Sequence, residues 1–127
     1  MRRLWLTVGI IALLAALCGL HLLHLDRLTG ELIQHIEEAD ECLYRDDWEG
    51  ARAVLQETYD LWESHALYLH TTLHHEDIDA VRASLRESMA YTDIRQDKAE
   101  CLAVNARMVN LLELLLEAEL PTIKNLM

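Results

Sequence analysis

The sequence predicts an all-α protein whose N-terminal transmembrane helix continues into an antiparallel up-down four-helix bundle. Three observations predict it: an uncharged apolar run near the N-terminus, apolar spacings of three and four residues beyond that run, and a scarcity of helix-breaking residues. The 127 residues include one Pro and four Gly, whereas a many-stranded β fold needs turn residues at short, regular intervals. A chain of this length is expected to form one folded unit outside the membrane.

The first predicted element is the apolar run over residues 4–25, LWLTVGIIALLAALCGLHLLHL, which contains no Asp, Glu, Lys or Arg. As a helix the run would extend about 33 Å, at about 1.5 Å per residue, which is enough to cross the hydrocarbon core of a bilayer. Arg2 and Arg3 precede the run, and Arg27 is the only basic residue close behind it. The positive-inside rule then predicts a cytoplasmic N-terminus. We therefore expect a single-pass protein of the cell membrane, with residues 1–25 as cytoplasmic end and anchor and residues 26–127 as an extracytoplasmic bundle.

A cleaved signal peptide is the main alternative to an anchor, because it also begins with basic residues and an apolar core. The sequence favours an anchor, since no A-x-A cleavage site follows the run and Ala16-Leu17-Cys18 is a poor substitute. Leu17 also disfavours lipid attachment at Cys18, because a lipoprotein signal needs a small residue before its cysteine. If the run were cleaved, the product would be a secreted helical bundle.

Small residues form a strip along one face of the predicted span, at Gly9, Ala12, Ala16 and Gly19. Spacings of three and four place these positions on one side of a helix, where small side chains let another transmembrane helix approach closely. The expected partner is another membrane protein or a second copy of this chain. The alternative is that the strip has no packing role, since small residues are common in membrane spans.

Apolar residues recur every three or four positions throughout the rest of the chain, which predicts helices. Asp46 and Asp47 offer an N-cap for a helix that begins at Trp48, and Pro121 would begin or permit a last turn. Short connections favour antiparallel neighbours. A tetratricopeptide-like hairpin is the alternative, but the sequence lacks a second copy of the repeat. The expected bundle helices cover about residues 25–44, 48–64, 67–94 and 98–119.

Acidic residues dominate the part of the chain beyond the span. The whole chain has 11 Lys and Arg against 22 Asp and Glu, a formal net charge of −11. Because Arg2 and Arg3 lie before the span, residues 26–127 carry 9 basic against 22 acidic residues, a net −13. We expect no nucleic-acid partner, since phosphate binding needs a surplus of basic residues. An anionic bilayer would also repel this domain, so the span alone is expected to hold it there.

Histidines cluster around the start of the predicted third bundle helix. Four of the seven fall within residues 65–75, and Glu76, Asp77 and Asp79 follow. On a continuous helix His70, His74 and Asp77 would share one face at i, i+4 and i+7, and imidazole and carboxylate ligands suit Zn²⁺ or another first-row metal. These three residues are therefore the candidate metal site, although they do not form a zinc signature such as H-E-x-x-H. The alternatives are histidines that pack or hydrogen-bond within the bundle, or a pH-sensitive contact with a membrane partner.

Two cysteines are predicted to lie close together. Cys42 ends the first bundle helix and Cys101 begins the fourth, so an up-down bundle brings both to the membrane-distal end, where a disulfide would suit an oxidising exterior. The alternative is two small buried apolar residues. Elsewhere the sequence has no Gly-rich phosphate loop and no recognisable catalytic constellation. We expect no enzyme activity, and no cofactor apart from the candidate Zn²⁺.

The order of short motifs along the chain resembles a known family. An Arg-Arg start and one apolar span are followed by Asp47-Trp48-Glu49-Gly50-Ala51, Trp-Glu-Ser-His at 62–65, His-His-Glu-Asp-Ile-Asp at 74–79 and Asn-Ala-Arg at 105–107. This layout resembles the domain-of-unknown-function 4363 family, small single-span membrane proteins of Gram-positive bacteria. The resemblance implies membrane attachment and a helical outer domain, and it brings no assigned activity or catalytic residues.

These observations together predict a membrane-anchored accessory protein. Its span and its acidic bundle would engage another envelope protein. The alternative function is a metal-binding extracytoplasmic module built on the His/Asp cluster.

Overall fold

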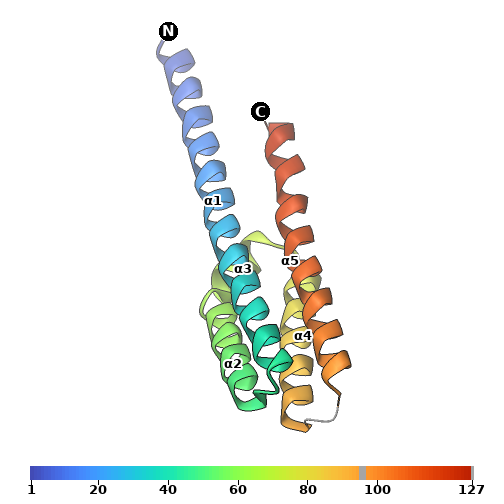
Figure 1. Ribbon diagram of the computed structural model, residues 1–127. Coiled ribbons are helices and arrows are strands. Elements are labelled where there is room, and N and C mark those ends of the chain that lie inside the picture. The colour runs from blue at the N-terminus through green and yellow to red at the C-terminus, as the bar shows by residue number, and fades with distance from the viewer. Residues whose placement is uncertain (95–96, 127) are drawn as a thin grey trace.

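The computed structural model describes the backbone of residues 1–94 and 97–126, with the side chains of these residues described as far as Glu119. These residues contain no strand, so the predicted all-α class is confirmed (Figure 1). The helices are α1 (Arg2–Tyr44), α2 (Trp48–Ser64), α3 (Ala66–Thr72), α4 (His75–Ile94) and α5 (Lys98–Leu126).

Four long helices pack side by side around the core. α1 and α4 each contact both α2 and α5, while the short α3 contacts α2 and α4. Figure 1 shows that α1 projects beyond the others at its N-terminal end and that α5 runs back toward that end. This arrangement is the one expected of an up-down bundle. The largest buried side chains come from all five helices and are Leu25, Leu32, Ile36, Leu43, Leu55, Trp62, Leu69, Ile78, Leu85, Met108 and Leu112.

The start of α2 follows from a local cap. The Asp47 carboxylate accepts a hydrogen bond from the Gly50 backbone N–H at 2.9 Å, which satisfies one of the N–H groups left free at a helix start. Asp46 has φ 59°, a left-handed conformation that Asp tolerates better than most residues. The chain can therefore turn sharply between α1 and α2, and the predicted cap at this turn is confirmed at Asp47.

The predicted helix over residues 67–94 is wrong as one continuous element, because the structure divides it into α3 and α4. Leu73, between them, has extended backbone angles of φ −120° and ψ 167°. The hydroxyls of Thr71 and Thr72 both donate to the Tyr68 carbonyl, at 2.7 and 2.9 Å. Hydroxyls that bond the backbone in this way compete with the helical ladder, and β-branched residues are poor helix formers. At the other end of the bundle, α5 continues past the expected Glu119 to Leu126.

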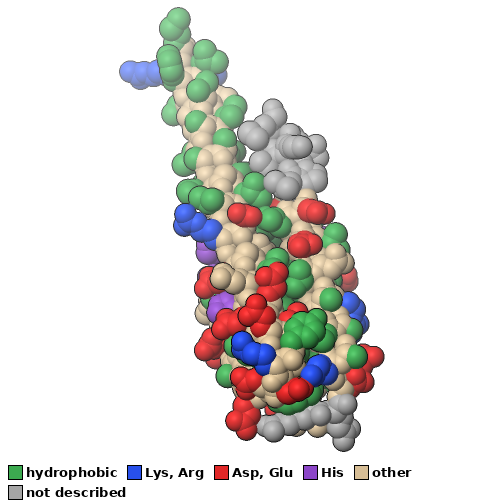
Figure 2. Space-filling view, viewed as in Figure 1, with side chains coloured by type: hydrophobic (Ala, Val, Ile, Leu, Met, Phe, Trp, Pro, Cys, Tyr) green, Lys and Arg blue, Asp and Glu red, His purple; other side chains and the backbone are tan. Residues whose placement is uncertain are grey.

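The N-terminal part of α1 is apolar and uncovered. From Leu4 to Leu20 every side chain except Cys18 is exposed, and the first buried side chain of α1 is Leu25. On the face drawn in Figure 2, hydrophobic side chains cover this part between a basic tip and a bundle rich in Asp and Glu. Among the described residues, α1 is the one helix long and apolar enough to cross a membrane. A signal sequence near the N-terminus shares this length and composition.

Candidate functional site

The break at Leu73 changes which histidines lie together. Because α3 ends at Thr72 and α4 begins at His75, the i, i+4 and i+7 geometry expected for His70, His74 and Asp77 does not exist. All three side chains are exposed. His70 stays in the candidate site, whereas His74 and Asp77 lie outside the group of potential ligands that the fold brings together. That group is His70, His75 and Asp79, and two of its three members were missed because the sequence was analysed as one helix.

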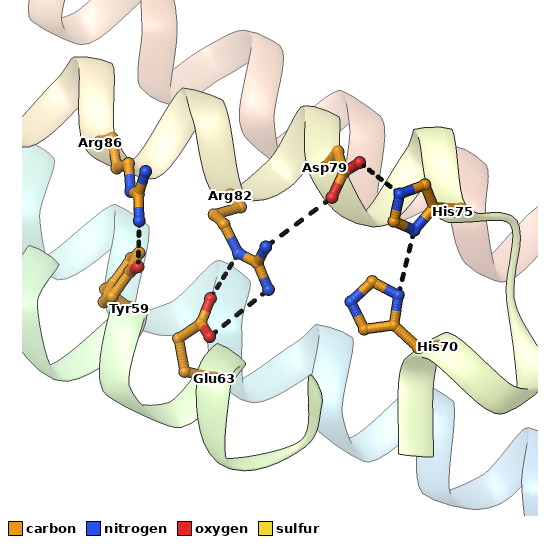
Figure 3. Close-up of polar contacts among 7 residues, drawn as sticks. All are labelled: Tyr59, Glu63, His70, His75, Asp79, Arg82 and Arg86. Atoms are coloured by element: carbon orange, nitrogen blue, oxygen red, sulfur yellow. Dashed lines mark hydrogen bonds and ion pairs between the residues drawn. The ribbon is translucent and has the colours of Figure 1, made fainter. Parts of the chain in front are cut away.

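His75 stands between the other two members of this group (Figure 3). Its Nδ1 lies 3.2 Å from the Nδ1 of His70, and its Nε2 lies 3.0 Å from the Oδ2 of Asp79. The imidazole rings of the two histidines are 5.1 Å apart and inclined by 41°. One potential ligand atom from each residue lies within 4.8 Å of the others. The end of α3 and the first turn of α4 thus form a small polar group that is open to solvent.

A row of polar contacts along α4 connects this group to α2 (Figure 3). Arg82 lies 3.8 Å from Asp79 through Nη1 and 2.6 Å from the Glu63 carboxylate through Nε. One turn further along α4, Arg86 donates a hydrogen bond to the Tyr59 hydroxyl at 3.0 Å. That hydrogen bond raises the pKa of Arg86 above its ordinary value. These contacts fix the outer face of α4 against α2, and they hold Asp79 where it faces His75.

A second group of histidines lies at the C-terminal end of the apolar run over residues 4–25, within α1. The His21 ring contacts the Tyr68 hydroxyl through Nδ1 and lies 3.4 Å from the Glu119 carboxylate through Nε2. His24 packs edge-on against Tyr68, with ring centres 4.9 Å apart, and lies 5.4 Å from His65. Burial, and then the charge of Glu119, raise the pKa of the Tyr68 phenol, so this residue stays a neutral hydrogen-bonding group. α3 and α5 therefore contact α1 at the C-terminal end of the candidate span.

The bundle also contains a buried polar connection that the sequence patterns did not reveal. Ser88 donates to the Asn105 side-chain oxygen at 2.5 Å, and Asn105 donates to Asp40 at 2.7 Å. Ser88 and Asn105 are fully buried. Burial raises the pKa of the half-buried Asp40, while the hydrogen bond from Asn105 opposes that rise. The three residues link α4, α5 and α1.

The expected disulfide between Cys42 and Cys101 stays a prediction. Cys42 and Cys101 lie in one buried cluster, as the sequence predicted, but both are free thiols. Their sulfur atoms have separate neighbours: Arg45 donates to Cys42 at 3.7 Å, and Cys101 lies 3.5 Å from the Ser88 hydroxyl. Burial raises the pKa of the Cys101 thiol. The structure therefore agrees with the alternative of two small buried residues.

The strip of small residues lies open on α1. Gly9, Ala12, Ala16 and Gly19 are all exposed, and a methyl group added at Gly9 or Gly19 would meet nothing within 4 Å. Gly19 also lines an apolar hollow of about 340 Å³ between α1 and α5. The other residues lining this hollow are Leu22, Leu23, Asp26 and Leu116. A packing role for the strip stays a prediction.

These features define a class: an all-helical protein in which one helix, long and apolar enough to cross a membrane, continues into a helical bundle. Within that class, the chain belongs to the family described as Domain of unknown function (DUF4363), whose model matches residues 20–126. The predicted family resemblance is thus confirmed, while the single span and the Gram-positive source stay predictions. The comparisons with curated proteins and with solved structures gave no match.

Proposed function

We propose that this chain is a membrane-anchored, non-enzymatic accessory protein that engages another envelope membrane protein through its span and its acidic bundle. Its N-terminus would lie in the cytoplasm and residues 26–127 outside it. The observation that carries the proposal is the uncovered apolar segment of α1, which runs without a break into a helix of the bundle. A soluble domain rarely exposes so much contiguous apolar surface unless a membrane or a partner covers it.

Two further features support a protein partner inside the membrane. Between Gly9 and Gly19 the strip places only small side chains on one side of the span, so the backbone of another helix could approach closely there. The bundle carries a net charge of −13, which disfavours contact with anionic lipid and leaves the span as the means of attachment.

Affinity purification of the full-length chain from native membranes, with mass spectrometry of what is retained, tests this proposal. Ala16→Leu places a bulky side chain on the strip and is expected to abolish recovery of the partner. Thr7→Leu is the matched control, because residue 7 lies on the opposite side of the helix from residue 16. Recovery of the chain alone would contradict an accessory role and favour a homo-oligomer. Equal recovery with both variants would contradict the assigned face.

The expected orientation has its own test. Protease added outside intact cells should degrade residues 26–127 and leave the anchored N-terminal fragment protected. Protection of the whole chain, with cleavage only after the membrane is opened, would contradict an extracytoplasmic bundle. Release of an intact, shortened chain into the medium would favour the cleaved signal peptide instead.

A further inference from the structure

We propose that His70 and His75 bind a divalent first-row transition-metal ion such as Zn²⁺ between their Nδ1 atoms, with Asp79 as the residue that positions His75. This site is independent of the proposed accessory role. It also differs from the His70, His74 and Asp77 set predicted from the sequence, because it depends on the break between α3 and α4.

The separation of the two nitrogens is the first observation. The Nδ1 atoms of His70 and His75 are 3.2 Å apart. Two nitrogens bound to one tetrahedral Zn²⁺, each at about 2.0–2.1 Å, lie about 3.3 Å from each other. The two rings therefore already stand at the separation that a shared ion requires, and little movement of either side chain is needed.

The tautomer of His75 is the second observation. Its Nε2 lies 3.0 Å from an oxygen of Asp79, and an ionised carboxylate can only accept a hydrogen bond. In the neutral ring Nε2 therefore carries the proton and Nδ1 has a lone pair that faces His70. Without an ion, the His70 Nδ1–H donates to this lone pair, so ion binding requires the His70 proton to move to its Nε2. Metal-binding histidines commonly donate their other ring N–H to a carboxylate in this way, because the contact fixes the ring and makes the ligand more basic.

The position of Asp79 is itself supported. Its other carboxylate oxygen lies 3.8 Å from Arg82, which is paired with Glu63 at 2.6 Å. The Arg82 and Glu63 side chains are only 27% and 34% exposed, whereas the His75 side chain is 74% exposed. The ion pair that contacts Asp79 is therefore more restricted by its neighbours than His75 is. The negative charge of Glu63 also offsets the positive charge of Arg82, which would otherwise repel a metal cation bound nearby.

The ligand set points to a class of ion. Imidazole nitrogen suits Zn²⁺, Cu²⁺ and Ni²⁺, whereas Mg²⁺ and Ca²⁺ prefer oxygen ligands. Two protein ligands leave the remaining coordination positions to water or to a side chain of another protein. The ion is therefore expected to exchange readily, and its binding to compete with protons, since both imidazoles must be neutral.

Isothermal titration of the full-length chain with Zn²⁺, in detergent micelles and with a purification tag free of histidine, tests the site. One ion per chain is expected, and H70A and H75A should each weaken binding at least tenfold. The matched controls are H74A and D77N, which change neighbouring exposed groups outside the site and should leave the affinity unchanged. Absence of heat with the unaltered chain would overturn the proposal, as would equal losses in the control variants.

The role of Asp79 needs a separate readout. D79N is expected to weaken Zn²⁺ binding about tenfold, the lower end of the effect of removing such a supporting carboxylate. In the metal-free variant, ¹⁵N chemical shifts of the His75 ring should show loss of the pure Nε2–H tautomer, with an unchanged circular dichroism spectrum. Weaker binding with an unchanged tautomer would overturn the positioning role.

Discussion

Replacing Asn105 by alanine tests whether the buried polar connection contributes to the packing of α1, α4 and α5. Asn105 is fully buried. It accepts a hydrogen bond from Ser88 at 2.5 Å and donates one to Asp40 at 2.7 Å. The substitution removes both hydrogen bonds at once and leaves the Ser88 hydroxyl with the Cys101 sulfur, at 3.5 Å, as a weaker neighbour. The carboxylate of Asp40 loses a hydrogen bond that opposes the cost of its burial.

The expected loss of stability follows from these contacts. A neutral hydrogen bond contributes a net of about 1 kcal/mol, and one to a charged group about 1.5–3 kcal/mol. Because alanine is the better helix former, the substitution also stabilises α5 by about 0.5 kcal/mol. The small cavity that it leaves further lowers the free energy of unfolding. Asn105→Ala should therefore lower the free energy of unfolding by about 2–4 kcal/mol.

Urea denaturation of the full-length chain in micelles, followed by far-UV circular dichroism, measures this loss. Asn110→Ala is the matched control, because Asn110 lies on the same helix and is exposed. It should gain the same helix propensity and lose no buried contact, so its stability should stay within about 0.5 kcal/mol of the unaltered chain. If Asn105→Ala changed stability as little as Asn110→Ala does, the buried connection would contribute nothing and the reasoning would fail.

Two further predictions concern the Asp40 carboxyl and the two buried thiols. Burial raises the pKa of the Asp40 carboxyl in the folded protein above its ordinary 3.8, so the charged form is less favourable in the folded protein than in the unfolded chain. At neutral pH, Asp40→Asn should have a free energy of unfolding at least as high as that of the unaltered chain. Measured by urea denaturation, the difference between the two proteins should shrink as the pH falls toward 3.8. A difference that grows as the pH falls would contradict a raised pKa of Asp40. The buried thiols of Cys42 and Cys101 should resist iodoacetamide in the folded chain and react after denaturation without reductant, as read by mass spectrometry. Fast modification of the folded chain, or none after denaturation, would be contrary results.

The helices that could be predicted well are those whose limits are set by neighbouring residues. α2 begins at the expected Trp48 and ends at the expected Ser64. Its start could be predicted because it depends on a cap from Asp47, three residues before Gly50. The all-α class followed in the same way from apolar spacing and from the scarcity of Pro and Gly. The break at Leu73 was missed because no Pro or Gly marks it. Two threonine hydroxyls bond one carbonyl at the end of α3. Thr29 and Thr58 make the same kind of bond inside continuous helices, so threonine by itself does not mark a break.

The candidate site was therefore only partly predictable. His70 was found because histidines are concentrated around it, whereas His75 and Asp79 were missed because helical spacing was counted across a break. His75 and Asp79 form an i, i+4 pair within α4, so the same spacing rule would have found that pair once the start of α4 was known. An error in one helix boundary thus changed two of three site residues, while the four predicted bundle helices differ from those of the described residues only by the division into α3 and α4.

The buried connection illustrates a different limit. Asn105 lies in a row of buried residues along α5, with Cys101 before it and Met108 and Leu112 after it, so a polar residue on an apolar face was the available clue. Its partner Asp40 is 65 positions away in sequence, and that pairing depends on how α1 and α5 are rotated about their axes. Advancing by one residue turns a helix by about 100°, so an error of one position in facing would expose Asn105 and separate it from Asp40. Periodicity can identify the buried face of one helix, but only the mutual rotation of two helices decides which polar groups meet across them.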